Sequence, residues 1–384
     1  MRIVVDARPA VFPQKTGVGF YTWHLLRLLP RVDPATTYVA WYLNAGAITG
    51  GPRRPLRELG APNLVERGTP IPAGWFARST ERFDLPRIEW FARSDVLFAP
   101  NFVPPPTRSR RLVVTVHDLG FRRFPDTAPH STRRWLARLD GTLRRATRVI
   151  AVSESTRRDL VELYHVESAR ITVVPLGVDG GTFGPADAGV VEAARSRLGV
   201  AGPYVVYVGG IEPRKNLPNL LWAFARLGPD LSLVIVGSGV EWNPQGTGLL
   251  REALERLPSE TRRRVVRTGY ISERDKVALL SGAEALVYPS LYEGFGLPVL
   301  EAMACGTPVV TSDRSSLPEV AGEAAVLVDP TDPEAIAAGV DRLLTDGRLR
   351  GRLREAGLAR AARFTWEETA RRTAQVLHEA GQEG

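Results

Sequence analysis

Short, largely apolar segments recur along this chain, and most of them are followed by a turn and then by a helix-like pattern. Examples are RIVVD at 2–6, LVVTV at 112–116 and YVVYV at 204–208. Segments without polar alternation are typical of parallel strands, because helices bury both faces of a parallel sheet. The repeated order of strand, turn and helix predicts an α/β protein with doubly wound sheets. In such sheets, ligands bind at the carboxyl ends of the strands.

The length of 384 residues suits two domains better than one. The segment DGGTFGPADAG, at 179–189, is rich in glycine and proline and is typical of a hinge. We therefore expect a first Rossmann-like domain over 1–185 and a second over 186–365. Residues 366–384 continue an amphipathic helical pattern.

Two glycines, Gly17 and Gly19, follow the first predicted strand, and a helix is predicted from about Tyr21. Glycine lets the backbone approach a ligand closely at a helix N-terminus. A dinucleotide site is not expected, because the pattern lacks its third glycine and the next strand ends in Asn44 instead of an acid. The Gly-x-Gly pattern also fits a purely structural turn.

A second turn, from Gly209 to Asn216, carries Gly210 and the two cations Arg214 and Lys215 just before a predicted helix. A bound diphosphate would meet these cations at the helix N-terminus. There they would offset the charge that develops on a leaving group. The alternative is an ordinary pair of surface cations.

His117 ends the predicted strand at 112–116, and Asp118 follows it. A side chain at the carboxyl end of a parallel strand opens toward the ligand edge of the sheet. Imidazole can donate a hydrogen bond to a sugar hydroxyl or a phosphate without acting as the base, and Asp118 would orient the ring or the loop. A satisfied structural histidine is the alternative.

The most informative stretch is LVYPSLYEGFGLPVLEAMACGTPVVTS, at 286–312, which predicts a strand, a glycine loop, a short helix and another strand. Backbone N–H groups at the helix N-terminus can bind an anion or sugar hydroxyls, and here they belong to Gly294, Phe295, Gly296 and Leu297. Glu293 and Glu301 are eight residues apart, about two helical turns, so we expect them on one side. A carboxylate can accept two hydroxyls of a sugar at once.

This stretch resembles the signature of the retaining glycosyltransferases of family 4, which have the two-domain GT-B fold. The Glu-x7-Glu spacing, the GFGLP loop and the AMACGTPVV passage match together. The resemblance implies that Glu293 lies against the donor sugar and that Glu301 holds the ribose. It also implies that residues 366–384 cross back to brace the first domain.

The resemblance extends to the other turns. Lys215 matches the family lysine by position, whereas Gly210 stands where many members have an arginine, so Arg214 would supply the second cation. The VHDL element around His117 resembles one that meets the donor sugar or the acceptor, with Asp118 on the acceptor side. The loop with Gly17 and Gly19 would face the donor phosphates, and the backbone at Ile271 would read the base.

We therefore expect a GT-B enzyme that transfers a hexosyl unit of the mannose or glucose type to an acceptor hydroxyl, with retention. The donor would be a GDP- or UDP-sugar, and IEPRKN at 211–216 leans toward GDP-mannose. No metal or other cofactor is expected, because no Asp-x-Asp motif follows a strand. A related epimerase or phosphorylase, or a non-catalytic nucleotide-sugar-binding protein, is the alternative. The acceptor remains open between lipid-linked, polysaccharide and small-molecule substrates.

The charge is uneven along the chain. Residues 1–190 hold 27 Lys and Arg against 17 Asp and Glu, although the whole chain has a net charge of only +8. A basic first half suggests an anionic partner, such as nucleic acid, an anionic membrane surface or a phosphorylated acceptor. We expect peripheral contact with an anionic membrane and no nucleic acid. A basic amphipathic helix predicted at 129–148 would serve such contact or pack on the core. A GC-rich genome would also enrich arginine.

The remaining composition points to the cytoplasm. Cys305 is the single cysteine, so no disulfide can form within the chain, and its small neighbours favour a buried hydrophobe over a nucleophile. No apolar run approaches the roughly 20 residues of a membrane span. MRIVVDARPA lacks the apolar core of a signal peptide.

Overall fold

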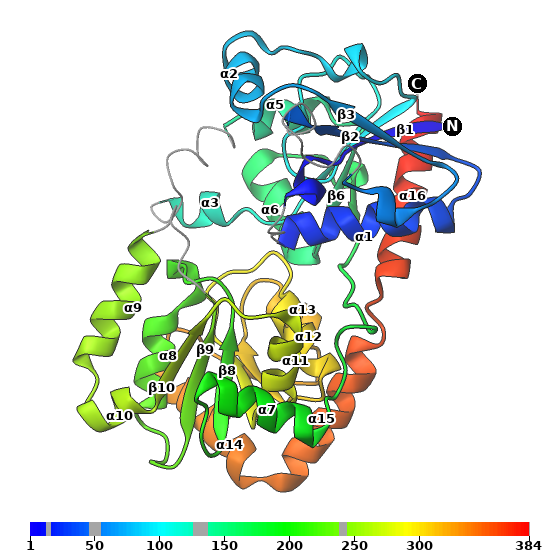
Figure 1. Ribbon diagram of the computed structural model, residues 1–384. Helices are drawn as coiled ribbons and strands as arrows, with labels where there is room; N and C mark the ends of the chain where they lie inside the picture. The colour runs from blue at the N-terminus through cyan, green and yellow to red at the C-terminus, as the bar shows by residue number, and fades with distance from the viewer. Residues whose placement is uncertain (13–16, 46–54, 126–136, 238–243, 384) are drawn as a thin grey trace. The chain divides into compact units, whose positions relative to one another are not determined.

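The computed structural model describes residues 1–12, 17–45, 55–125, 137–237 and 244–383. The chain divides into two compact units. Unit 1 comprises Met1–Leu119, Ser131–Gly177 and Trp366–Gly384, and unit 2 comprises Gly120–His130 and Val178–Thr365. Each unit is built on a parallel β-sheet covered by helices, which confirms the predicted fold class (Figure 1).

Unit 1 contains one sheet of seven strands. These are β1 (Arg2–Asp6), β2 (Thr37–Leu43), β3 (Leu64–Thr69), β4 (Val96–Ala99), β5 (Leu112–Val116), β6 (Arg148–Ala151) and β7 (Ile171–Val173). Its helices are α1 (Gly17–Val32), α2 (Ala73–Phe83), α5 (Leu139–Arg145), α6 (Glu154–Tyr164) and α16 (Trp366–Gln382). The strands lie in the order β3-β2-β1-β4-β5-β6-β7, all parallel, so the winding reverses between β1 and β4.

Unit 2 contains a sheet of six strands. These are β8 (Tyr204–Val208), β9 (Ser232–Val236), β10 (Val265–Gly269), β11 (Ala285–Tyr288), β12 (Val309–Ser312) and β13 (Val326–Val328). Its helices are α3 (Gly120–Arg123), α7 (Ala188–Leu198), α8 (Leu217–Phe224), α9 (Pro244–Arg256), α10 (Ser259–Arg263), α11 (Glu273–Ser281), α12 (Leu297–Ala304), α13 (Leu317–Ala321), α14 (Pro333–Thr345) and α15 (Gly347–Ala361). The parallel order β10-β9-β8-β11-β12-β13 reverses between β8 and β11.

The main segment of unit 2 begins at Val178, whereas the boundary was expected after residue 185. The backbone N–H of Val178 donates to the carbonyl oxygen of Phe364 at 2.9 Å, and Val178 forms an isolated parallel bridge with Thr365. These contacts join the expected hinge segment to unit 2. Phe124 also belongs to unit 2, where its ring lies 6.1 Å from that of Tyr292.

Several helices differ from the prediction. α1 begins at Gly17, so Gly17 and Gly19 lie in its first turn and not in a loop before Tyr21. α2 and α15 were not expected. α2 lies at the end of a segment rich in proline, glycine and arginine, and the segment of α15 has weak periodicity. The helix expected at 129–148 is shorter in its described part, where α5 ends at Arg145, and residues 129–136 lie outside the described residues.

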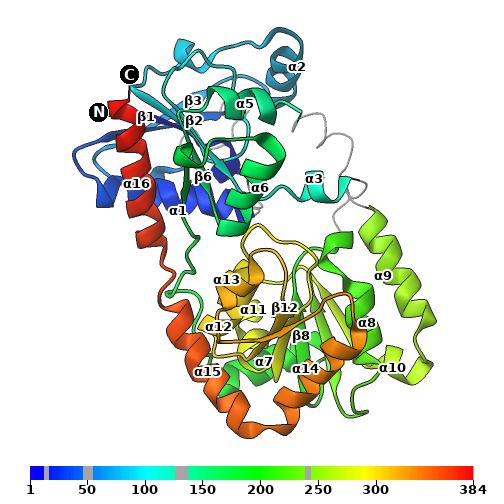
Figure 2. The same cartoon turned by 180° about the vertical axis from the view of Figure 1, so that it is seen from behind.

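The C-terminal helix belongs to unit 1 and lies beside α1 (Figure 2). The indole ring of Trp366 stacks on the His24 ring at 4.4 Å and lies 6.2 Å from the Tyr21 ring. The hydroxyl of Thr369 donates to the carbonyl oxygen of Pro175 at 2.8 Å. Trp366 is therefore the main aromatic anchor that holds α16 in unit 1.

Helices α14 and α16 are amphipathic: each buries mainly small and aliphatic residues on one face and exposes charges on the other. α16, for example, buries Trp366, Ala370, Val376 and Leu377 but begins with two exposed or half-exposed acids. Among the described residues, no helix combines the length and the apolar content needed to cross a membrane.

Candidate functional site

The two turns that carry the candidate residues of unit 2 follow β8 and β11. These strands are neighbours, and the winding of the sheet reverses between them. Ligands of open α/β sheets bind at such a reversal, beyond the carboxyl ends of the strands. Asn216 helps to hold the two turns together, because its side-chain amide donates to the carbonyl oxygen of Pro289 at 3.1 Å. Asn216 itself adopts the left-handed conformation, with φ of 61°, and ends the short helical turn Pro213–Lys215.

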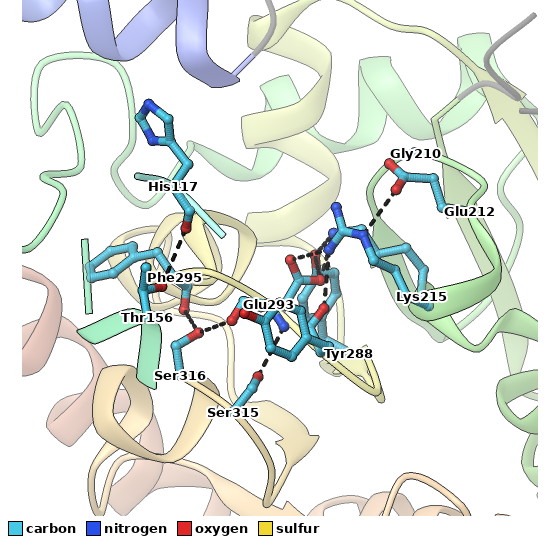
Figure 3. A network of polar contacts seen from close by, with 12 residues as sticks. His117, Thr156, Gly210, Glu212, Lys215, Tyr288, Glu293, Phe295, Ser315 and Ser316 are labelled. Atoms are coloured by element: carbon cyan, nitrogen blue, oxygen red, sulfur yellow. Dashed lines mark hydrogen bonds and ion pairs between the residues drawn. The ribbon is translucent and has the colours of Figure 1, made fainter. Parts of the chain in front are cut away.

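A compact polar cluster forms where these turns meet. The Lys215 ammonium donates to Oε1 of Glu293 at 2.5 Å and to the hydroxyl oxygen of Tyr288 at 2.8 Å. The Tyr288 hydroxyl in turn donates to the same Glu293 oxygen at 2.8 Å. Nη1 of Arg214 donates to the other carboxylate oxygen, Oε2, at 3.0 Å, while its Nε donates to Glu212. Figure 3 shows Lys215, Tyr288 and Glu293 converging on one point.

The cluster is buried, and its charges are balanced. Lys215 and Glu293 are each 7% exposed. Burial opposes the charged form of Glu293, but the charges of Lys215 and Arg214 outweigh this effect and lower the pKa of its carboxyl group to about 2. Burial and the Arg214 charge lower the pKa of the Lys215 ammonium. Burial and the Glu293 charge raise the pKa of the Tyr288 hydroxyl, so it stays protonated and donates.

Hydrogen bonds from Ser316 hold the loop between Glu293 and α12 in place. The hydroxyl of Ser316, a residue with no exposed surface, donates to the carbonyl oxygens of Glu293 at 2.9 Å and Phe295 at 2.7 Å. Gly296 has φ of 114°, and a Cβ atom there would lie 2.7 Å from Cδ2 of Leu317, so glycine is required. Within the described part of the chain, the N–H groups of Phe295, Gly296 and Leu297 have no acceptor. The loop thus presents donors at the start of α12.

The expectation that Glu293 and Glu301 project on one side assumed that both follow a helical repeat, and this assumption was wrong. α12 begins at Leu297, so Glu293 lies in the preceding loop and helical periodicity does not relate the two residues. Glu301 binds a different cation, since the Lys276 ammonium lies 3.1 Å from its Oε2. Burial raises the pKa of the Glu301 carboxyl group, and the Lys276 charge only partly offsets this.

His117 and Asp118 lie in unit 1, after β5. Nε2 of His117 is 2.8 Å from the carbonyl oxygen of Pro100. Because a carbonyl oxygen only accepts, Nε2 carries the proton, and Nδ1 is the acceptor in the neutral ring. Burial lowers the pKa of His117, which favours that neutral ring, while Pro100 and Asp118 oppose the shift. The ring donates inward through Nε2, so only Nδ1 is left for a ligand.

The other predicted residues are spread over both units. Gly17 and Gly19 belong to α1 in unit 1, and a Cβ atom at Gly17 would meet nothing within 4 Å. Gly210 follows β8, and its carbonyl oxygen accepts from the Tyr207 hydroxyl at 2.9 Å. Ile271 is half-buried between β10 and α11. The structure therefore joins Arg214, Lys215 and Glu293 in one cluster and places the remaining candidates on separate elements.

Sequence reasoning missed two polar residues of this site. Tyr288 is the last residue of β11, and its position at the carboxyl end of a strand was the available signal. Ser290 has no exposed surface, and its side chain is close enough to Glu293 to contribute to the lowered pKa of that carboxyl group. Cys305, the single cysteine, is not a reactive nucleophile, because burial raises the pKa of its thiol to about 12.

Two parallel-sheet Rossmann-like units are the architecture of the GT-B glycosyltransferases. The structure of Anabaena Alr3699/HepE in complex with UDP and glucose superposes with a TM-score of 0.74 over 99% of this chain and 100% of that one, at 18% identity. At this identity the likeness shows the fold alone. It confirms the expected GT-B class.

The chain belongs to glycosyltransferase family 4. The model of "Glycosyltransferase Family 4" matches residues 16–180, and that of "Glycosyl transferases group 1" matches residues 192–360. The chain is 33% identical over 296 residues to the O-antigen chain mannosyltransferase B of Escherichia coli, covering 75% of this chain and 76% of that protein. It is 35% identical over 259 residues to the MMP alpha-(1->4)-mannosyltransferase of Mycolicibacterium hassiacum, covering 65% of this chain and 58% of that protein.

Proposed function

We propose that this glycosyltransferase moves a hexosyl unit from a nucleoside-diphosphate sugar to an acceptor hydroxyl in glycan biosynthesis, with retention at the anomeric carbon. The observation that carries the proposal is the buried cluster of Arg214, Lys215 and Glu293 at the reversal point of the unit 2 sheet. It combines two cations, a carboxylate and the donors at the start of α12. A diphosphate and a sugar need these groups side by side.

The cations would stabilise the leaving group. When the bond between the anomeric carbon and the diphosphate oxygen breaks, negative charge accumulates on the diphosphate. Arg214 and Lys215 are held by Glu293 at 3.0 Å and 2.5 Å, and bound phosphate oxygens would share their N–H donors. Because these groups supply the positive charge, we propose catalysis without a metal ion, which chelation of the assay with EDTA tests directly.

Glu293 is suited to position the sugar. Oε1 accepts from Lys215 and Tyr288, and Oε2 accepts from Arg214. A carboxylate with these donors and a pKa of about 2 is a weak base and a weak nucleophile. We therefore assign it to the sugar hydroxyls and the cations, with the acceptor attacking on the face of the leaving group. Glu301, with its raised pKa, would bind the ribose hydroxyls.

The residues of unit 1 would act around the sugar and the acceptor. Nδ1 of His117 is available to accept a hydrogen bond from a hydroxyl, since Nε2 is engaged by Pro100. Asp118 would support this loop on the acceptor side. Gly17 and Gly19, in the first turn of α1, would face the donor phosphates, and Ile271 of unit 2 would contact the base.

The donor is proposed to be GDP-mannose or a UDP-linked hexose. The mannosyltransferases of Escherichia coli and Mycolicibacterium favour mannose, whereas the solved relative holds UDP and glucose. We would therefore test thermal stabilisation and slow donor hydrolysis with GDP-mannose, UDP-glucose and UDP-GlcNAc. Lys215→Met removes a site cation, and Arg263→Met removes an exposed cation of α10 as the matched control.

The expected result is stabilisation of the wild type and the Arg263 variant by one donor, and its loss in the Lys215 variant. Proton NMR of the transfer product should then show the anomeric configuration of the donor. Failure of every donor to bind or to be hydrolysed would refute the proposal, and inversion at the anomeric carbon would refute the retaining mechanism.

A further inference from the structure

Unit 1 has a large cavity of its own. Its volume is about 930 Å³, and residues on the loops after β1 and β4 line it together with α2. Asp6 ends β1, and Asn101 follows β4. These are the two strands between which the winding of this sheet reverses, where a ligand is expected. The cavity, called the crevice of unit 1 below, therefore lies where open α/β sheets bind their ligands.

The walls of this crevice are mainly aliphatic and aromatic. They include Val11, Phe12, Leu43, Phe76, Ala77 and Val103. Phe76 is 2% exposed and packs on Trp41, with 5.7 Å between the ring centroids, so this wall is held rigidly. Phe12 is 60% exposed, so its ring is available to contact a ligand in the crevice. A sugar ring alone would not use so much apolar surface.

The charges around the crevice are already compensated. Arg8 binds both carboxylate oxygens of the buried Asp6, at 2.8 Å and 2.6 Å, and its guanidinium lies over the Phe76 ring. Arg138 donates to Asp84 at 2.8 Å. Glu81 adds a further negative charge to the lining. No surplus of positive charge faces the cavity within the described residues, so a phosphate or carboxylate would not be attracted.

Two uncharged polar residues, Asn101 and Thr80, complete the lining, and the Thr80 hydroxyl donates to the carbonyl oxygen of Leu85 at 3.5 Å. The side-chain amide of Asn101 makes no hydrogen bond within the described residues, and the residue is half-buried. It can donate to and accept from a hydroxyl. An amphiphilic ligand fits this arrangement, with a hydroxylated end near Asn101 and an apolar remainder between Phe12, Leu43 and Ala77.

We propose that the crevice of unit 1 binds the uncharged hydrocarbon portion of the glycosyl acceptor, so that the acceptor is an amphiphile such as an alkyl- or lipid-linked sugar. This inference rests on the proposed function, because it gives the acceptor of that reaction a chemical class. The hydrocarbon could belong to a soluble glycoside or to a lipid in a bilayer, and the experiment separates these sources.

The first test is binding of octyl and methyl β-D-glucoside by isothermal titration calorimetry, with the octyl compound below its micelle concentration. The two ligands share the sugar and differ only in the alkyl chain. Since each buried methylene favours binding, the octyl glucoside is expected to bind at least ~100-fold more tightly. Equal affinities would overturn the proposal.

Two variants of α2 locate the binding site. Ala77 is exposed on the crevice wall, so Ala77→Trp should fold and fill the space, and the octyl preference should disappear. Arg82→Trp adds the same side chain on the same helix at an exposed position outside the lining, and the preference should remain. Retention of the preference in the Ala77 variant would overturn the assignment to this crevice.

A charged probe and vesicles complete the test. Octyl phosphate should bind at least ~10-fold more weakly than octyl glucoside, and tighter binding would overturn the uncharged class. Sedimentation with phosphatidylcholine vesicles, lost in the Ala77 variant, would identify a bilayer lipid as the source. Binding of the soluble glycoside alone would identify a soluble acceptor.

Donor hydrolysis separates this inference from the proposed function. The cations proposed to bind the diphosphate lie in unit 2, and the only unit 1 residues proposed to face the phosphates, Gly17 and Gly19, belong to α1. Ala77 belongs to α2, so Ala77→Trp should keep wild-type donor stabilisation and hydrolysis. A wild type that binds its donor but shows no alkyl preference would refute only the acceptor class. A wild type that binds no donor would refute the proposed function.

Discussion

Replacing Lys215 by methionine tests the physical account of the unit 2 cluster. Methionine keeps much of the aliphatic volume but removes the ammonium, which now donates to Glu293 at 2.5 Å and to Tyr288 at 2.8 Å. The side chains of Lys215 and Glu293 are only 9% and 8% exposed, so solvent screens their attraction weakly. The variant leaves Glu293 buried with Arg214 as its remaining cation.

The magnitude follows from the pKa of Glu293. A decrease from 4.5 to about 2 corresponds to about 3 kcal/mol in favour of the ionised carboxylate, at about 1.4 kcal/mol per pKa unit. Arg214 supplies part of this stabilisation and remains in the variant. The variant also no longer buries an ammonium group, which is itself unfavourable, so we expect Lys215→Met to lose about 2 kcal/mol of unfolding free energy. For a unit of this size, that lowers Tm by roughly 4–8 °C.

Glu293→Gln should be more harmful, because it leaves Lys215 and Arg214 buried without their shared carboxylate. We expect a loss of about 3–5 kcal/mol. Urea unfolding of the wild type, both single variants and the double variant completes a cycle. The double variant should be about 1–3 kcal/mol more stable than the sum of the single losses predicts.

If the loss of unfolding free energy in the double variant equals the sum of the two single losses within about 0.5 kcal/mol, the argument that Lys215 and Glu293 stabilise each other is refuted. The pH dependence gives an independent check. The pKa of Glu293 is depressed, so its contribution is complete above pH 4.5 and is lost as pH falls toward 2. The wild type should therefore lose this stability on acidification, whereas Glu293→Gln should not. Equal acid sensitivity of the two proteins would contradict the low pKa.

Three further outcomes are expected. Gly296→Ala should cost about 2 kcal/mol or more, because the new Cβ would meet Leu317 at φ of 114°, and unchanged urea stability would contradict the strained loop. Cys305, with a thiol pKa of about 12, should react with dithiobis(nitrobenzoate) at pH 8 only after unfolding, and rapid labelling of the native protein would show that the thiol is accessible. Trp366→Ala should destabilise unit 1 by about 3–5 kcal/mol through lost packing on His24, measured by thermal unfolding, and a loss below 1 kcal/mol would show that α16 is not anchored there.

The sequence by itself determined the strands, the turns and the chemistry placed after them. Apolar segments such as 112–116 and 204–208 became β5 and β8, because residues buried on both faces of a parallel sheet leave a clear local signal. The positions of Arg214, Lys215 and Glu293 after strands likewise identified them as candidates. α2 escaped prediction because it lies at the end of a segment, 45–83, that is rich in proline, glycine and arginine, and it buries only Phe76.

Only the tertiary structure decided which candidates meet. Lys215 and Glu293 are 78 residues apart in the chain, and they touch because β8 and β11 are adjacent in a sheet whose order the local sequence does not encode. The same packing places the Lys276 ammonium beside Glu301, a contact that the local sequence does not indicate. Short-range backbone sterics decide which residue types a turn can carry, so a turn is visible in the local sequence. The partner of each side chain depends on long-range pairing of strands, which is settled by burial of the whole sheet.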